Sequence, residues 1–179
     1  PKAIVPMRQL YPTGSWVSGN WLYSPIGDEM GGSLIGTGGT YAVTAAPNIE
    51  SAGAGDRLAL ASQTMTGDGE IVAHLSTLTG VGSMGGLMFR DGRAAGDPFA
   101  DIMLTPDQGV VMQWRSAAGG AISNQTMPGV SGPIWLRLVR SGSLFNVHVS
   151  DTGATGTWQL VSSTDIALSD TLETGLAAA

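Results

Sequence analysis

The sequence has no cysteine, few cations and no long apolar run, and each shortage excludes a class of protein. Without cysteine there is no disulfide framework, thiolate metal site or cysteine nucleophile. Only 8 Lys plus Arg stand against 14 Asp plus Glu, and they are scattered, so nucleic acid is not expected as a partner. No apolar stretch approaches the length of about 18 residues that a transmembrane helix needs. Charged residues make up 12% of the chain, too few for the surface of a helical bundle.

The chain is rich in glycine, with 27 residues, and in short segments whose apolar residues alternate with polar ones. Alternation with a period of two is typical of strands that are half buried in a sheet. About ten such segments follow one another at the spacing expected for an antiparallel β-sandwich. They are residues 40–45, 56–65, 69–78, 85–90, 99–104, 109–116, 133–142, 143–150, 157–163 and 174–179.

Turn residues separate these segments, and one turn stands out. "SDTGATGTWQLV" (150–161) brings a serine, an aspartate, glycines and threonines together before Trp158. Such a loop can hold a metal ion, frame a sugar site or turn the chain between two strands. Glycines supply the backbone freedom of a turn, and aspartate stabilises bends through its own backbone. We therefore predict a hairpin loop in which Asp151 stabilises the bend and Trp158 anchors the returning strand.

Several phrases of the sequence resemble one family. "GDGEIVAHLSTL", "GGLMFR", "PIWLRLVRSGSLF" and "TWQLVSS" are similar, in this order, to bacterial concanavalin A-like (lectin/glucanase-type) jelly-roll modules of secreted multidomain proteins. The resemblance covers residues 24–179 and implies a two-sheet jelly roll in a secreted, cell-surface or periplasmic protein. Residues 1–23 match no phrase of the family and are expected to form an irregular wrap or docking segment. The first residue is not methionine and no signal peptide precedes it, so we expect a longer precursor.

The sequence offers little for catalysis. His74 and His148 are the available bases near neutral pH, no nucleophile-elbow motif is present, and the closely spaced acids of jelly-roll glucanases are missing. We therefore expect a protein that is not an enzyme, with a polysaccharide hydrolase using His74 or His148 as the alternative. No cofactor is expected other than a structural calcium ion. Its candidate ligands are Asp68 with Glu70 and Asp28 with Glu29, although Asp-Gly pairs also make ordinary turns.

Alternation also predicts a polar sheet face. If the apolar positions of each strand form the core, the intervening positions point outward and present planar hydrogen-bonding groups together with an indole. These candidate ligand-binding residues are His74, Arg90, Gln113, Arg115, Trp135, Arg137, Asn146 and His148. A concave sheet with these residues would suit sugar hydroxyls or carboxylates. Equally, the face is simply solvated, or some of its arginines are buried and paired beneath a covering segment.

Two functions follow from these features. The first is non-catalytic binding of a glycan or polysaccharide by an accessory or cell-surface recognition module. The second is a structural or interaction subunit of a larger extracellular or membrane-associated assembly. The second rests on the N-terminal segment, where Trp16, Trp21 and Tyr23 follow closely and would either contact a partner or pin the segment to the sandwich.

Overall fold

The computed structural model describes residues 2–6, 15–16, 21–27, 32–37, 39–45 and 55–179, and these residues form strands and no helix. The strands are β1 (Lys2–Pro6), β2 (Ser15–Trp16), β3 (Leu22–Ile26), β4 (Ser33–Thr37), β5 (Thr40–Thr44), β6 (Leu58–Thr66), β7 (Gly69–Leu75), β8 (Thr77–Thr79), β9 (Gly85–Arg90), β10 (Phe99–Thr105), β11 (Gly109–Arg115), β12 (Ser123–Met127), β13 (Ile134–Ser141), β14 (Leu144–Ser150), β15 (Gln159–Asp165) and β16 (Thr171–Ala178).

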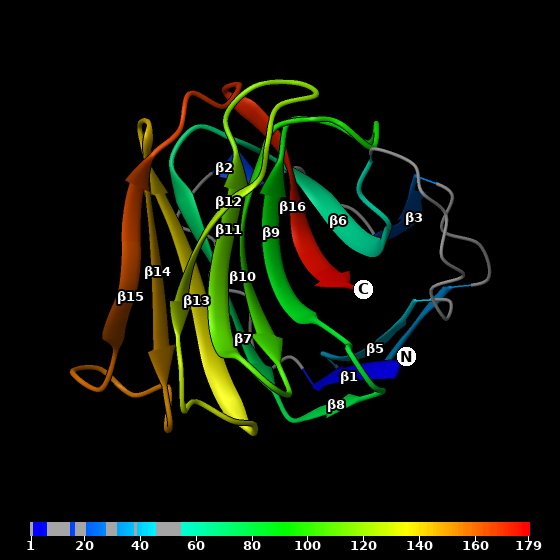
Figure 1. Ribbon diagram of the computed structural model, residues 1–179, viewed down its shortest axis with the longest axis vertical. Coiled ribbons are helices and arrows are strands. Elements are labelled where there is room, and N and C mark those ends of the chain that lie inside the picture. Colours follow the sequence, from blue (N-terminus) through cyan, green and yellow to red (C-terminus); the bar gives the residue numbers. More distant parts are fainter. Residues whose placement is uncertain (1, 7–14, 17–20, 28–31, 38, 46–54) are drawn as a thin grey trace.

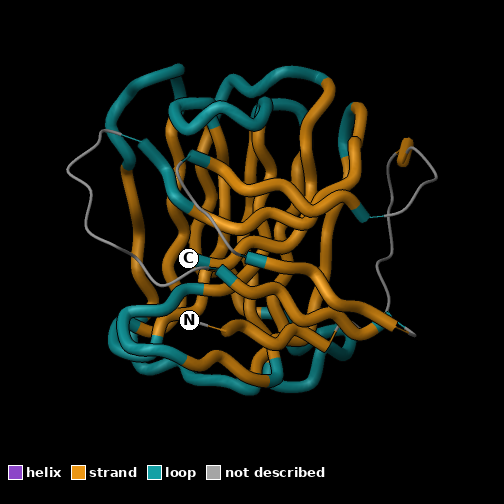
Figure 2. The backbone as a smooth tube through the Cα atoms, turned by 90° about the vertical axis from the view of Figure 1, so that its right-hand side faces the viewer, coloured by secondary structure: helices purple, strands orange, loops and turns teal. Residues whose placement is uncertain are grey.

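The strands form three antiparallel sheets (Figure 1). The large sheet has eight strands in the order β12-β11-β10-β9-β16-β6-β2, with β3 also paired to β6. The small sheet has the order β15-β14-β13-β7, and a third sheet has the order β4-β5-β1-β8. Seen from the side, loops gather at the two ends of the strands (Figure 2). The fold is an all-β jelly-roll sandwich; the alternation predicted the antiparallel sandwich, and the resemblance implied the jelly roll.

The main core lies between the large and the small sheet. In β7 and β13, every second side chain is buried, as alternation requires when one face of a strand meets the core. Phe89 of the large sheet meets Phe145 of the small sheet edge to face, with ring centroids 6.0 Å apart. Both are fully buried, and such a side chain contributes about 1.5–3 kcal/mol by leaving water. These contacts hold the two sheets together.

The large sheet is also buried on its other face. A second apolar cluster lies there, formed by Ile26, Leu58, Leu60, Met88, Phe99, Met103 and Ala177. All residues of β9 and β10 are therefore buried, including those that alternate away from the main core. The solvated polar face predicted for the sandwich cannot be on these strands.

Within residues 1–23 the structure describes 2–6, 15–16 and 21–23, and most of these residues lie in strands. β1 pairs with β5 and β8, while β2 and β3 pair with β6. Trp21 and Tyr23 pack against the main core, and the Trp21 ring lies 5.7 Å from that of Tyr41. The side chain of Trp16 lies outside the described residues. The division into residues 1–23 and 24–179 stays a prediction.

Candidate functional site

The outward face of the small sheet gathers most of the predicted site residues. In the register of the sheet, Trp135 lies opposite His74, and Arg137 lies opposite His148. Asn146 lies two positions before His148 on β14, so both side chains point to the same face, and Asn146 is half-buried like the others. We call this surface, formed by Glu70, His74, Trp135, Arg137, Asn146, His148 and Trp158, the outer face. The alternation of β7, β13 and β14 thus brings His74, Trp135, Arg137, Asn146 and His148 together.

The indole of Trp135 is held by neighbouring protein groups. The His74 ring lies 5.0 Å from it, tilted by 35°. Gly153, in the loop after β14, also packs on the indole, because a Cβ at this position would lie 2.6 Å from Trp135 Cδ2. Gly153 has a φ of 69°, which favours glycine as well. Trp135 therefore anchors the loop.

Arg137 lies at the centre of the outer face. Its Nε and Nη2 donate to the same oxygen of Glu70, at 2.8 and 2.5 Å. Its guanidinium also lies over the ring of Trp158, 5.8 Å from the centroid. The two side chains of the ion pair are 31% and 16% exposed, so solvent and ligand can reach them. Glu70 and Trp158 also belong to this face, although the sequence pattern assigned these two residues to other roles.

His148 adds no positive charge to the face at neutral pH. Burial lowers the pKa of its imidazole, and the nearby Arg137 lowers it further. Its Nδ1 is buried and has no hydrogen-bond partner among the described residues. The imidazole is therefore a neutral polar group beside the Arg137–Glu70 pair.

A cavity of about 430 Å³ opens beside Trp158, at the end of the small sheet where β14 passes into the loop. Its lining residues are Val130, Ile134, Val149, Ser150, Asp151, Thr152, Gly156, Thr157, Trp158 and Gln159. This volume falls within the range of small-molecule sites. Residues with hydroxyl, carboxylate and amide groups therefore line the same cavity as an indole, at the edge of the outer face.

The loop that frames the cavity is held by its own hydroxyls. Ser150 Oγ and Thr157 Oγ1 lie 2.5 Å apart, and Ser150 Oγ accepts from the Gly153 amide at 2.9 Å. Thr157 Oγ1 donates to the Ala154 carbonyl at 2.7 Å. The bend is thus stabilised by Ser150 and Thr157, whereas the sequence analysis predicted that Asp151 would stabilise it. The exposed Asp151 carboxylate accepts no hydrogen bond from any residue that the structure describes.

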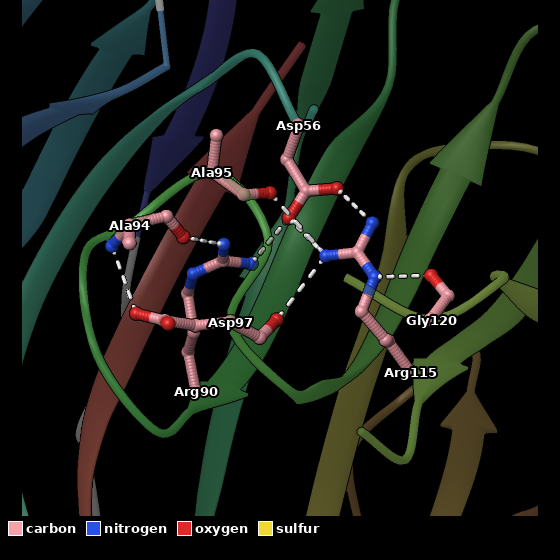
Figure 3. A network of polar contacts seen from close by, with 7 residues as sticks. All are labelled: Asp56, Arg90, Ala94, Ala95, Asp97, Arg115 and Gly120. Carbon is pink, nitrogen blue, oxygen red and sulfur yellow. Dashed lines mark hydrogen bonds and ion pairs between the residues drawn. The ribbon is translucent and has the colours of Figure 1, made fainter. Parts of the chain in front are cut away.

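Arg90 and Arg115 do not belong to this face, and the alternative of buried, paired arginines holds for both. They lie on β9 and β11 of the large sheet and are 0% and 5% exposed. Figure 3 shows the Asp56 carboxylate between their guanidinium groups. Asp56 Oδ2 lies 2.7 Å from Arg90 Nη1, and Asp56 Oδ1 lies 2.6 Å from Arg115 Nη2. Because the second apolar cluster covers this side of the sheet, the two cations are buried and share one carboxylate.

Backbone carbonyls are further partners of these arginines. Arg115 donates to the carbonyls of Gly120, Ala95 and Asp97, at 2.9, 3.3 and 3.2 Å, and Arg90 donates to that of Ala94 at 2.5 Å. The hydrogen bond to Asp56 raises the pKa of Arg115 above its ordinary value. The cluster therefore fixes the loops after β9 and β11 to the segment before β6, which is a structural role.

Gln113 also stands apart from the outer face. It is half-buried on β11 and lines a smaller cavity of about 200 Å³ with Gly82, Ser83, Met84, Thr105, Pro106, Asp107 and Gln108. The large sheet thus holds Arg90, Gln113 and Arg115, and the small sheet holds the other predicted site residues.

The residues considered for calcium have other partners where the structure describes them. Asp68 Oδ1 accepts from the Gly142 amide at 2.6 Å, which ties two neighbouring turns together, and Glu70 pairs with Arg137. Asp28 and Glu29 lie outside the described residues. In the described ranges, no group of three or more His, Asp or Glu side chains is placed to hold a metal ion. The calcium ion stays a prediction.

Fold and site together define a class: a jelly-roll β-sandwich whose small sheet carries a polar, aromatic outer face beside a hydroxyl-lined cavity. Among solved structures, the chain is similar to a carbohydrate-binding module, CBM66, from Bacillus subtilis. The identity is 18%, the TM-score is 0.55, and the match covers 87% of this chain and 89% of that one. It is also similar to a functionally unknown protein from Saccharomyces cerevisiae, at 16% identity and a TM-score of 0.52. That match covers 69% of this chain and 65% of the yeast chain.

These likenesses support the fold alone, because both identities are low. No protein-family model matches the chain, and no curated protein matches it. In the residues that the structure describes, no helix is long and apolar enough to cross a membrane.

Proposed function

We propose that the protein binds a carbohydrate noncovalently, as a recognition module, through the outer face and the adjoining cavity. The observation that carries this proposal is the arrangement of Arg137. Its guanidinium is oriented by Glu70 and lies over the Trp158 indole beside a cavity of about 430 Å³. Planar groups with fixed orientation give directional hydrogen bonds to hydroxyls, and an indole offers an apolar surface to a sugar ring.

The name of one protein with a similar fold agrees with this proposal. One similar structure is named a carbohydrate-binding module, and the match extends over most of both chains. Sequence reasoning reached glycan binding from the alternation of five strands, and the residues it named on three of them, β7, β13 and β14, share the outer face of the small sheet. The two arguments are independent, since one uses overall shape and the other uses named side chains.

The test is a polysaccharide pull-down and a glycan array, made with the natural sequence and with Arg137→Gln. Because this variant leaves Glu70 without its cation, a second variant carries both Arg137→Gln and Glu70→Gln and keeps the face neutral. We expect both variants to fold and to lose most of the binding. Far-ultraviolet circular dichroism and thermal unfolding check that they fold.

The matched control is Arg93→Gln. Arg93 is 42% exposed and pairs with Glu173 at 2.9 Å, so this variant also breaks a partly exposed ion pair, but on the large sheet. Its binding should equal that of the natural sequence. Unchanged binding in both Arg137 variants would refute the assignment of the site, and absence of binding to every glycan would refute the function.

A further inference from the structure

The charges around the cavity indicate which sugars it can take. Among its lining residues, Asp151 is the charged one, and it is acidic. The remaining polar side-chain groups are hydroxyls, the Trp158 N–H and the Gln159 amide. Arg137, the cation nearest in the outer face to Trp158, is paired with Glu70. His148 is neutral because burial lowers its pKa. Among the residues described, the cation nearest the cavity is therefore already paired with a carboxylate, and the charge that lines the cavity itself is negative.

The whole chain adds to this local balance, because its formal net charge is −6. A carboxylated or sulfated polysaccharide would meet repulsion both from the protein as a whole and from Asp151 at the cavity. A carboxylate and an amide that line the same cavity are instead suited to the hydroxyls of a sugar, since the carboxylate accepts and the amide can donate or accept. Buried hydroxyls of a bound sugar need such partners.

We infer that the ligand is an uncharged polyhydroxylated saccharide, which packs on Trp158 while Asp151 and Gln159 hydrogen-bond its hydroxyls. This inference rests on the proposed function and narrows it to one chemical class. The loop is already shaped for the task, because the Ser150 and Thr157 hydroxyls fix its bend. Little ordering of the loop is then needed when the sugar binds.

The experiment compares the retention of the protein in affinity electrophoresis by two sets of polysaccharides. The neutral set is a glucan, a mannan, a galactan and a fructan, and the carboxylated set is polygalacturonate and alginate. We expect retention by at least one neutral polymer and none by the carboxylated set at low ionic strength, where repulsion is strongest. Trp158→Ala and Asp151→Asn should each weaken the retention by about tenfold, the size expected when a central contact is lost.

Asp170→Asn is the control, because it removes the same charge at the other end of the small sheet. There the Asp170 carbonyl accepts from Arg140 at the end of β13, whereas the cavity is lined by Ile134 at its beginning. Retention by the carboxylated polymers and not by the neutral ones would overturn the inference and leave the proposed function standing. Retention by neutral polymers that is unchanged in Trp158→Ala and Asp151→Asn would also overturn it. Retention by neither set would overturn both.

Discussion

Replacing Asp56 by asparagine should destabilise the protein strongly, because one carboxylate serves two buried arginines. Asp56 lies 2.7 Å from Arg90 and 2.6 Å from Arg115, and its side chain is only 6% exposed. Removing one partner of a buried ion pair costs about 3–5 kcal/mol. Arg115 keeps three backbone carbonyls and Arg90 keeps one, which places the expected loss near the lower end, at about 3 kcal/mol.

Urea unfolding followed by tryptophan fluorescence measures this loss. With a denaturant slope of about 2 kcal/mol per molar urea, the midpoint of Asp56→Asn should fall by about 1.5 M while the slope stays the same. The exposed Asp170→Asn removes the same charge and should change the free energy of unfolding by no more than about 0.5 kcal/mol.

A double-mutant cycle with Arg115→Met then measures how much of the loss belongs to the pair. The loss in Asp56→Asn should be smaller once Arg115 is gone, because one stranded cation has been removed. A loss below about 1 kcal/mol, as for an exposed pair, would refute the reasoning that these charges are buried and mutually dependent.

Two further predictions concern single groups. Asp101 is 1% exposed, and burial raises the pKa of its carboxyl, so the folded state favours the protonated form. This preference stabilises the folded state fully below the ordinary pKa of 3.8. The stabilisation is lost as the pH rises through the higher pKa of the folded state. The stability of Asp101→Asn relative to the natural sequence should therefore increase with pH in urea unfolding series, and a constant difference would contradict it. Gly153→Ala should destabilise the protein by about 1–3 kcal/mol, through a positive φ and a clash with Trp135. Gly156→Ala, with a φ of 83° and open space, should cost less, and equal losses in thermal unfolding would show that the clash is absent.

The strands of the small sheet could be predicted closely because they have one buried and one solvated face. The predicted segment 133–142 is the strand Ile134–Ser141, and 143–150 is Leu144–Ser150. Polar and apolar residues must alternate when the two faces differ in this way. The same alternation assigned Trp135, Arg137, Asn146 and His148 to one face, and the register of β13 and β14 confirms that placement.

The same reasoning misplaced Arg90 because the large sheet is covered on both faces. On β9, Met88 and Arg90 alternate with Leu87 and Phe89, and all four are buried. Alternation distinguishes two faces but does not tell which of them meets solvent. An arginine can be buried when a carboxylate from another part of the chain pairs with it. Here that carboxylate belongs to Asp56, 59 residues before Arg115, and the sequence does not indicate this pairing.

The roles of Glu70 and Trp158 depend on contacts between strands. Glu70 lies opposite Val139 in the sheet and so comes beside Arg137, but this register is set when β7 pairs with β13 and cannot be counted along the chain. Trp158 was expected to anchor a returning strand, and its ring lies under the guanidinium of Arg137, a contact that the alternation of one strand does not reveal. Polar edge strands were missed for a related reason: Ser123–Met127 has little apolar character because it is exposed.

The position of β16 has a consequence for how the molecule assembles. This strand lies between β9 and β6, so it joins the two halves of the large sheet. Its first residue, Thr171, pairs with Thr66, a separation of 105 residues along the chain. Closing so long a loop is entropically unfavourable until many contacts form at once, and sheets built from distant strands fold slowly. Without β16, β6 and β9 would each present an open edge where this strand now pairs, and open strand edges can pair with other chains.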